Sequence, residues 1–166
     1  MQSLVEAFSN SLGQYVSAEV CVFLISMLPL IELRGGLLAA SLLKVPITTA
    51  IPLCIIGNII PIPFILLFIR QIFKWMKKVP LLRGIVEKLE ARAMRKSADV
   101  TKYEFLGLTL FVGIPIPGTG AWMGSLIAAL LEMDFKKAIA AELLGIAMAT
   151  VIVSILSYGL LGAVLN

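Results

Sequence analysis

Three long apolar stretches without a charged residue constrain this chain most: Val45–Ile69, Phe105–Leu131 and Leu143–Leu165. Each is long enough to cross a hydrocarbon core, which takes roughly 20 helical residues. Hydrophobic residues make up 60% of the chain, above the roughly 45–50% of soluble domains. Because the stretches are continuous rather than alternating, they favour helices over strands. We expect an all-α, multi-pass integral protein of the cell membrane.

The first 19 residues predict a separate helix. Ser3 and Glu6 have the spacing of a capping box. Apolar residues follow at helical spacing: Val5, Phe8, Leu12 and Tyr15. Such an amphipathic helix would lie on the membrane surface, and the alternative is a disordered tail. No Lys or Arg precedes Arg34, so the basic region of a signal peptide is missing and we expect none.

The residue types of an enzyme or a metal site are scarce. The chain has no His, which is the commonest general base and metal ligand. Cys21 and Cys54 lie in apolar segments, where cysteine usually serves as a small buried hydrophobe. We therefore expect neither catalysis nor a bound cofactor or metal.

Most of the charge lies in one segment, residues 74–104. It holds nine of the 14 basic residues: Lys74, Lys77, Lys78, Arg83, Lys88, Arg92, Arg95, Lys96 and Lys102. By the positive-inside rule this segment is cytoplasmic. Its apolar residues fall near one helical face: Leu81, Leu82, Ile85, Leu89 and Ala93. The segment predicts a basic amphipathic helix on the anionic inner leaflet or, alternatively, a solvated linker. Nucleic-acid binding is not expected.

Matches between the two halves predict an internal duplication when the chain is shifted by 88 residues. Pro29 then meets Pro117, and two glycine pairs coincide, Gly36 with Gly124 and Gly57 with Gly145. Each half begins with an interrupted apolar segment, continues through a polar turn and ends with a long apolar helix. The expected division is 1–19 (interfacial helix), 20–73 (first repeat), 74–104 (basic linker) and 105–166 (second repeat).

The interrupted segments are Val20–Leu43, broken at Pro29 and at Gly35-Gly36, and Phe105–Leu131, broken at Gly113–Gly120. Prolines remove backbone donors and push the preceding residue out of the helical region. The remaining pieces are too short to cross a core of about 30 Å alone. They predict either re-entrant hairpins or kinked spans.

Charge distribution favours hairpins. With one hairpin and one crossing helix per half, the halves are inverted, and Arg70, Lys136, Lys137 and the basic linker all lie in the cytoplasm. Only Lys44 then lies outside. With four full crossings, Lys136 and Lys137 would face the opposite side from the linker. Inverted repeats with interrupted segments at matching positions point to a transporter site.

Charges within an apolar segment indicate a functional site, and "LIELRGGLL" contains Glu32 and Arg34. We expect them at the turn of the first hairpin beside Gly35 and Gly36, with the next helix N-terminus facing the break. The candidate residues of the second hairpin are Pro115, Pro117, Gly118, Thr119, Gly120 and Trp122. Thr119 is expected to cap the helix that follows. Two helix N-termini and Arg34 would form an anion site that suits a lipid phosphate.

Glu32 would then balance Arg34 or carry a proton, and the alternative is a purely structural ion pair. Asn58 and Glu142 are further candidates for proton or ion coupling. For Asn58 an interhelical hydrogen bond is the simpler interpretation, and for Glu142 it is a position near the cytoplasmic interface.

The motifs "PLIELRGGLLAA" and "FVGIPIPGTGAWMGSLIAALL" resemble the family of small multidrug export proteins, a distant relative of the DedA superfamily. The resemblance implies an acidic role for Glu32 and a second-hairpin break at Pro115, Pro117 and Gly118. It also implies movement of lipids, including polyprenyl phosphates, and dependence on the proton gradient. DedA-like second hairpins carry arginines where this chain has Ile114 and Gly120.

The expected function is transport of an anionic lipid or amphipath, such as a polyprenyl phosphate, coupled to a proton or ion gradient. The alternatives are a small proton-coupled exporter of cationic drugs, with Glu32 as its site, and a membrane scaffold that does not transport. Expected partners are membrane lipids and an amphipathic substrate. A small-residue stripe (Gly120, Gly124, Ala128) would also suit a homodimer.

Overall fold

A computed structural model describes residues 17–160, except for the side chains of Asp99 and Leu160. The described residues are helical, with no strand among them, which confirms the all-α expectation. The N-terminal helix predicted over 1–19 lies almost wholly outside the described residues. The chain forms two packing units. The first unit consists of the residues up to Asn58 and those from Ala149 onward, and the second unit consists of residues 59–148. Both long helices are divided between the units.

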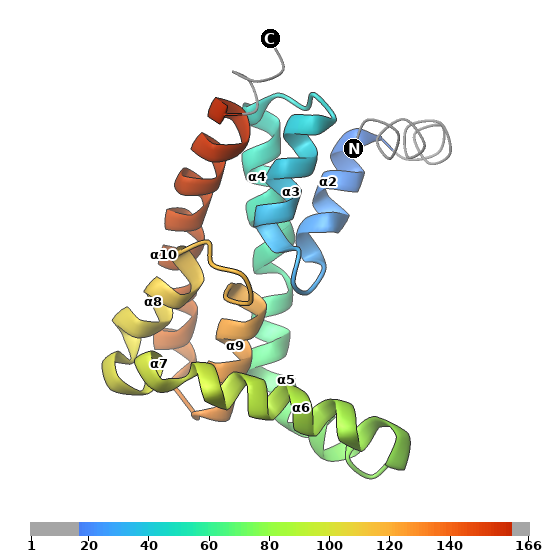
Figure 1. The fold of residues 1–166 in the computed structure, drawn as a ribbon, viewed down its shortest axis with the longest axis vertical. Helices are drawn as coiled ribbons and strands as arrows, with labels where there is room; N and C mark the ends of the chain where they lie inside the picture. Colours follow the sequence, from blue (N-terminus) through green and yellow to red (C-terminus); the bar gives the residue numbers. More distant parts are fainter. Residues whose placement is uncertain (1–16, 161–166) are drawn as a thin grey trace. The chain divides into compact units, whose positions relative to one another are not determined.

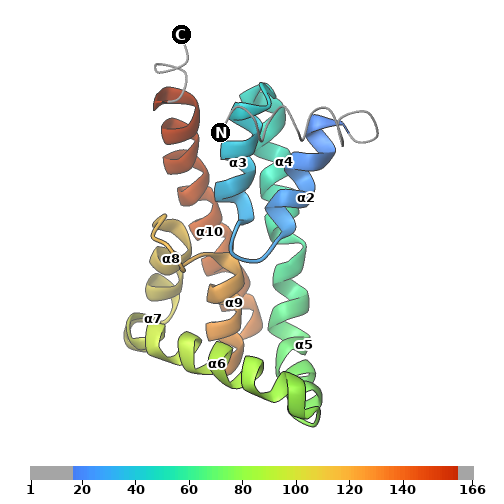
Figure 2. The ribbon, with the colours of Figure 1, turned by 45° about the vertical axis from the view of Figure 1, so that its right-hand side comes forward.

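The first unit is built on an antiparallel helix pair. Its elements are α2 (Ala18–Met27), α3 (Glu32–Leu42), α4 (Ile47–Ile59), the end of α10 (Phe135–Ser154) and the π-helix η1 (Ile155–Leu160). Figures 1 and 2 show α2 and α3 side by side, joined by a tight turn. The Ser17 hydroxyl accepts a hydrogen bond from the Val20 N–H at 3.4 Å and so caps α2.

Two hydrogen bonds join the end of α3 to η1. The Ser41 hydroxyl donates to the Ser157 carbonyl at 2.9 Å, and the Tyr158 hydroxyl donates to the Val45 carbonyl at 2.9 Å. These two side-chain donors stabilise this end of the unit.

The second unit surrounds α9. Its elements are α5 (Pro61–Met76), α6 (Pro80–Lys96), α7 (Ala98–Tyr103), α8 (Phe105–Gly113), α9 (Ala121–Leu130) and the start of α10. Helix α9 packs against α5, α6 and α8, and Figure 2 shows α6 lying across α5 and α9 rather than along them. Nearly every side chain from Ala121 to Ala129 is buried.

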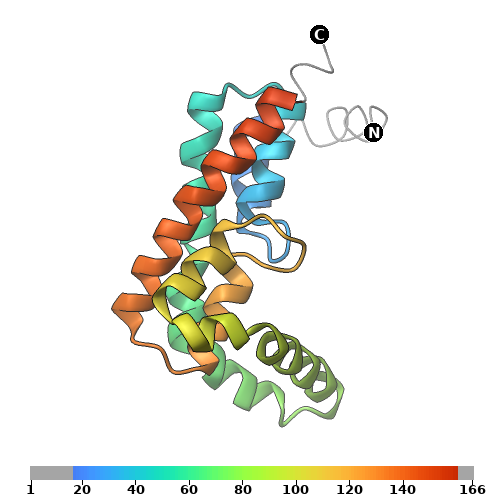
Figure 3. The same ribbon diagram turned by 60° about the vertical axis from the view of Figure 1, so that its left-hand side comes forward.

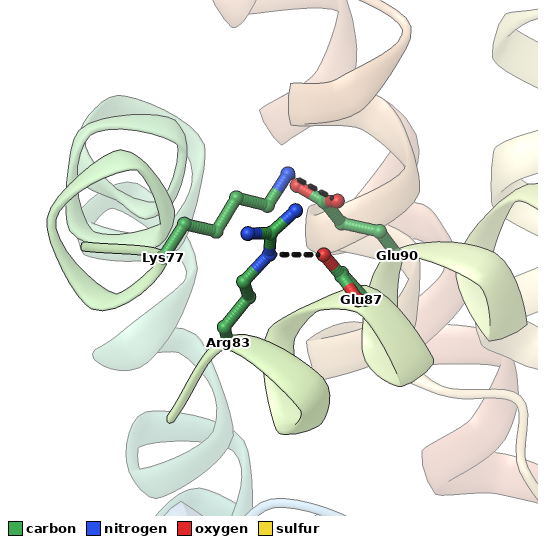
Figure 4. A network of polar contacts seen from close by, with 4 residues as sticks. All are labelled: Lys77, Arg83, Glu87 and Glu90. Atoms are coloured by element: carbon green, nitrogen blue, oxygen red, sulfur yellow. Dashed lines mark hydrogen bonds and ion pairs between the residues drawn. The ribbon is translucent and has the colours of Figure 1, made fainter. Parts of the chain in front are cut away.

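The basic linker forms the predicted helix as α6. Of the predicted apolar face, Leu81, Ile85 and Leu89 are exposed. Ala93 is buried in the unit together with Val86. Two ion pairs organise the polar side: Lys77 with Glu90 at 2.6 Å and Arg83 with Glu87 at 2.8 Å, shown together in Figure 4. The helix therefore carries apolar residues on two sides, one covered by the unit and one open.

Between residues 17 and 160, two helices are long and apolar enough to cross a membrane, Ile47–Met76 and Phe135–Gly159. They correspond to the crossing helices expected from the sequence. The first consists of α4 and α5, which meet at Ile60 just before Pro61. The sequence predicted one unbroken helix here. Pro61 lacks an N–H donor and stands where α4 and α5 separate, whereas Pro52 lies inside α4.

The 88-residue register recurs in the backbone. Helix α4 begins at Ile47 and α10 at Phe135, and 135 minus 47 is 88. The preceding turns are alike: Lys44 and Glu132 have left-handed φ values of 57° and 56°. In each turn the residue that follows donates a backbone hydrogen bond to the last turn of the preceding helix. The Val45 N–H donates to the Ala40 carbonyl at 2.9 Å, and the Met133 N–H donates to the Ala128 carbonyl at 3.0 Å. These bonds are the six-to-one bonds of Schellman C-caps.

Candidate functional site

The first hairpin turns at residues 28–31, and Glu32 begins the helix that follows. Leu30 and Glu32 have left-handed φ values of 73° and 53°, a conformation that costs most side chains energy. The Glu32 side chain is buried, with only 4% of its surface exposed. Arg34 lies in the first turn of α3 and is half-buried. The expectation that both residues lie at the turn of an interrupted apolar segment is therefore correct.

The predicted second break, at Gly35-Gly36, is wrong. Both glycines lie within α3, because glycine in a helix costs only about 1 kcal/mol relative to alanine. Gly36 instead permits a close approach between elements. A Cβ at this position would overlap the Ser26 hydroxyl of α2 and lie 2.9 Å from the Cys54 sulfur of α4. The glycine pair therefore serves helix packing and does not form the turn.

The close approach at Gly36 yields a prediction on stability. Gly36→Leu should lower the thermal midpoint in detergent by roughly 5–10 °C, because the added side chain has no space in a packed interior. Gly84→Ala is the matched control. Gly84 lies within α6 with open space around it, so alanine there should keep or raise the midpoint. A Gly36→Leu protein as stable as wild type would mean that α2, α3 and α4 are not this tightly packed.

The second hairpin turns through residues 114–120, as expected. Helix α8 ends at Gly113 and α9 begins at Ala121, and Figure 3 shows the open, non-helical loop between them. Pro115 and Pro117 lie in this loop, where neither needs a backbone donor. Gly118 and Gly120 adopt φ values of 81° and 131°, which favour glycine.

Thr119 does not hold the cap position of α9, which Gly120 occupies. The Thr119 hydroxyl donates backward within the loop, 2.8 Å from the Ile116 carbonyl and 3.0 Å from the Ile114 carbonyl. The left-handed φ of Gly118 reverses the chain just before Thr119. The Thr119 side chain therefore stabilises the loop.

Cations from α6 reach the second hairpin, which the sequence did not reveal. The Lys96 ammonium donates to the Gly118 carbonyl at 2.7 Å and lies 3.4 Å from the Pro117 carbonyl. A Cβ at Gly118 would lie 3.0 Å from Nη2 of Arg92, so both side chains reach the same turn. Their four-residue spacing on α6 was the only available signal, and it does not reveal which surface they face.

Glu142 is buried rather than interfacial. None of its surface is exposed, and the Ser125 hydroxyl donates to its Oε1 at 2.8 Å. A Cβ at Gly124 would lie 3.4 Å from the same oxygen. The expected position near the cytoplasmic interface is therefore wrong. A carboxyl held by a hydroxyl between α9 and α10 can exchange a proton only through a path inside the protein.

A family model described as "Putative small multi-drug export protein" matches residues 32–152. The chain belongs to this family. No curated protein and no solved structure is similar enough to match. The match begins at Glu32 and includes the whole second hairpin. Family membership and the two long apolar helices mark a membrane protein, and the family description indicates a role in membrane transport.

In this family member, the two remaining predicted residues, Asn58 and Trp122, lie in different surroundings. Asn58 is buried, and within the described residues its Oδ1 accepts no hydrogen bond, so the expected interhelical bond is not made through that oxygen. Trp122 is half-buried and lines an apolar groove of about 440 Å³ with Phe64 and Phe68 of α5. That groove suits an apolar ligand group and offers no charge.

The predicted site residues fall into two sets, one in each packing unit. Glu32, Arg34, Gly35, Gly36 and Asn58 belong to the first unit. The second-hairpin residues, Trp122 and Glu142 belong to the other. Within 17–160, no cluster of three or more His, Cys, Asp and Glu side chains is arranged to hold a metal ion.

Proposed function

We propose that this protein transports an anionic lipid or another anionic amphipath, driven by a proton or ion gradient. The observation that carries the proposal is Glu32, buried at the start of α3 directly after the turn of an apolar segment, with Arg34 two residues later. Ionisable groups at membrane depth are costly and typically mark a substrate or proton path. The guanidinium of Arg34 matches a phosphate or carboxylate head.

We further propose that both interrupted segments are re-entrant hairpins of two inverted repeats. Helices α2, α3, α8 and α9 have only 9 to 11 residues each, and roughly 20 are needed to cross a bilayer. In the second unit, Val100 and Glu104 before α8 line one pocket of about 300 Å³ together with Glu132 and Asp134 after α9. A segment whose two ends meet in this way supports a hairpin over a crossing.

The proposed topology predicts which side of the membrane each loop faces. In a background without Cys21 and Cys54, Lys136→Cys should react with an impermeant thiol reagent only from the cytoplasm. Position 136 is exposed. It is preferable to position 134, because the Asp134 carboxylate accepts a hydrogen bond from the Lys137 N–H at 3.0 Å. Lys88→Cys should label from the same side and Thr48→Cys from outside. Exclusive labelling of position 136 from outside would rule out the inverted arrangement.

Proton coupling is assigned to the buried carboxyls. Glu32 and Glu142 each have at most 4% of their surface exposed, and buried carboxyls in the apolar segments of membrane proteins typically mark proton or ion paths. Glu142 keeps a hydroxyl partner in Ser125. We propose Glu32 as the principal proton carrier and Glu142, with Asn58, as secondary groups.

Export of cationic drugs is the second candidate, favoured by the family description. The groove lined by Phe64, Phe68 and Trp122 suits a flat, mostly apolar molecule that carries a positive charge. The two candidates differ in the charge of the substrate, so one assay separates them.

Flux into vesicles tests both candidates. Purified protein in liposomes should move a fluorescent phosphatidylglycerol between leaflets faster than protein-free liposomes do, and an imposed pH gradient should change the rate. Ethidium in the same vesicles should show no protein-dependent flux. Ethidium transport without lipid movement would establish the drug exporter and exclude our first candidate.

A further inference from the structure

A groove in the second unit combines a cationic end with apolar walls. It occupies about 420 Å³ between the end of α6, helix α8 and the loop of the second hairpin. Arg95 and Lys96 lie at its polar end, and Leu110, Phe111, Ile114 and Ile116 form its apolar walls. The volume falls in the usual range for small-ligand sites, roughly 300–1,000 Å³. We call it the α6–α8 groove.

The cationic end carries a concentrated positive charge. Besides Arg95 and Lys96, the Arg92 guanidinium reaches Gly118 in the adjoining turn. Among the described side chains, no carboxylate lines this groove and none forms an ion pair with these three cations. The cations near the start of α6 differ, because Lys77 at the end of α5 pairs with Glu90 and Arg83 in α6 pairs with Glu87 (Figure 4). Adjacent like charges repel, and an anion relieves that repulsion.

Lys96 is held in position by the protein itself. Its ammonium donates to the Gly118 carbonyl at 2.7 Å, so part of its donor capacity stabilises the hairpin loop. Lysine has three donors, and the second contact, to the Pro117 carbonyl, is long at 3.4 Å. A fixed ammonium with spare donor capacity is preorganised for an anion, since it gives up little side-chain entropy on binding.

The apolar walls of the groove are exposed at the surface of the protein. Leu110, Ile114 and Ile116 have 49%, 40% and 53% of their surfaces exposed. In a membrane protein such residues contact acyl chains, and an alkyl chain along them leaves its head beside Arg95 and Lys96. The groove therefore complements an amphipath with one anionic head and at least one alkyl chain.

We propose that the α6–α8 groove binds an alkyl or acyl chain bearing a phosphate, with the phosphate at Arg95 and Lys96. This deepens the proposed transport function, on which it rests for its biological role, but binding itself is measurable without transport. The ligand is either a phospholipid of the bilayer or a free single-chain phosphate, which share this chemistry.

Native mass spectrometry in a neutral detergent tests the binding. Wild-type protein should retain dioleoyl phosphatidylglycerol at least about fivefold more than dioleoyl phosphatidylcholine. Arg95→Gln combined with Lys96→Gln should abolish this preference. Lys88→Gln is the control, because Lys88 is an exposed cation on the same helix that does not line the groove. Equal retention of the two lipids by wild type, or equal loss in Lys88→Gln, would overturn the proposal.

Further arms guard against misfolding and identify the source of the ligand. Arg95→Gln alone leaves the Lys96–Gly118 contact intact and should still weaken phosphatidylglycerol retention, with an unchanged thermal midpoint. A stable Arg95→Gln protein with full retention would also contradict the site. Dodecyl phosphate should bind about tenfold or more tightly than octyl phosphate if the walls hold the chain. Tighter binding of dodecyl phosphate than of phosphatidylglycerol would identify a single-chain ligand.

Binding and transport can fail separately. Retention that depends on Arg95 and Lys96, without any lipid flux in liposomes, would leave the groove established and remove the transport proposal. Flux of phosphatidylglycerol that persists at the wild-type rate in a double variant without lipid preference would keep the transport function and place its path elsewhere.

Discussion

Replacing Arg34 by Gln should reduce transport of an anionic lipid at least about tenfold, and adding Glu32→Gln should not restore it. Tenfold corresponds to about 1.4 kcal/mol, less than a buried charge pair usually contributes when one partner is removed, about 3–5 kcal/mol. The lower figure fits Arg34 because it is only half-buried. Arg34→Lys should fail too, since lysine keeps the charge but loses the planar fork.

Stability and transport measured together decide whether the two charges only hold the hairpin. If their role is structural, Glu32→Gln/Arg34→Gln should recover both thermal midpoint and flux relative to the single variants, because no lone buried charge remains. Under our proposal the midpoint recovers and the flux does not. Arg70→Gln is the control, since Arg70 forms an exposed ion pair with Glu132 at 2.6 Å and should tolerate the change. Wild-type flux in the double variant would remove both residues from the mechanism.

Making the second hairpin continuous should abolish transport while the protein still inserts. Pro115→Ala, Pro117→Leu and Gly118→Ala together favour helix over loop by about 3 kcal/mol for each proline. They also place a side chain at the φ of 81° that Gly118 adopts. Insertion is measured by labelling the exposed Lys88→Cys position, and transport by lipid flux. An active triple variant would mean that the break has no part in the mechanism.

The hairpin positions were largely predictable, because proline and glycine act locally. Pro115 and Pro117 predicted the loop that the structure has between α8 and α9. Gly35-Gly36 was wrongly predicted as a break for a related reason. A glycine pair weakens a helix but does not stop one, and the tight contact of Gly36 with Ser26 and Cys54 decides its conformation. Such contacts join segments far apart in sequence and leave no periodic signal.

The cations at the second hairpin could not be predicted either. Lys96 reaches Gly118 across 22 positions, and the direction of its side chain depends on how α6 packs against α9. The burial of Val86 within the unit was missed for the same reason. Charge composition did indicate a basic amphipathic segment. It did not indicate that Arg95 and Lys96 would line a groove with α8.

Lys44 and Glu132 share a left-handed turn although their side chains differ in charge. This conformation costs a residue other than glycine roughly 1–2 kcal/mol, yet both turns adopt it without glycine. Equivalent helix ends thus carry opposite charges, and charge near helix ends biases how a segment orients during insertion. Lys44→Glu with Glu132→Lys would keep both turns and move the positive charge to the side proposed as cytoplasmic. Selection could therefore adjust the orientation of each half by recharging one turn without rebuilding a helix.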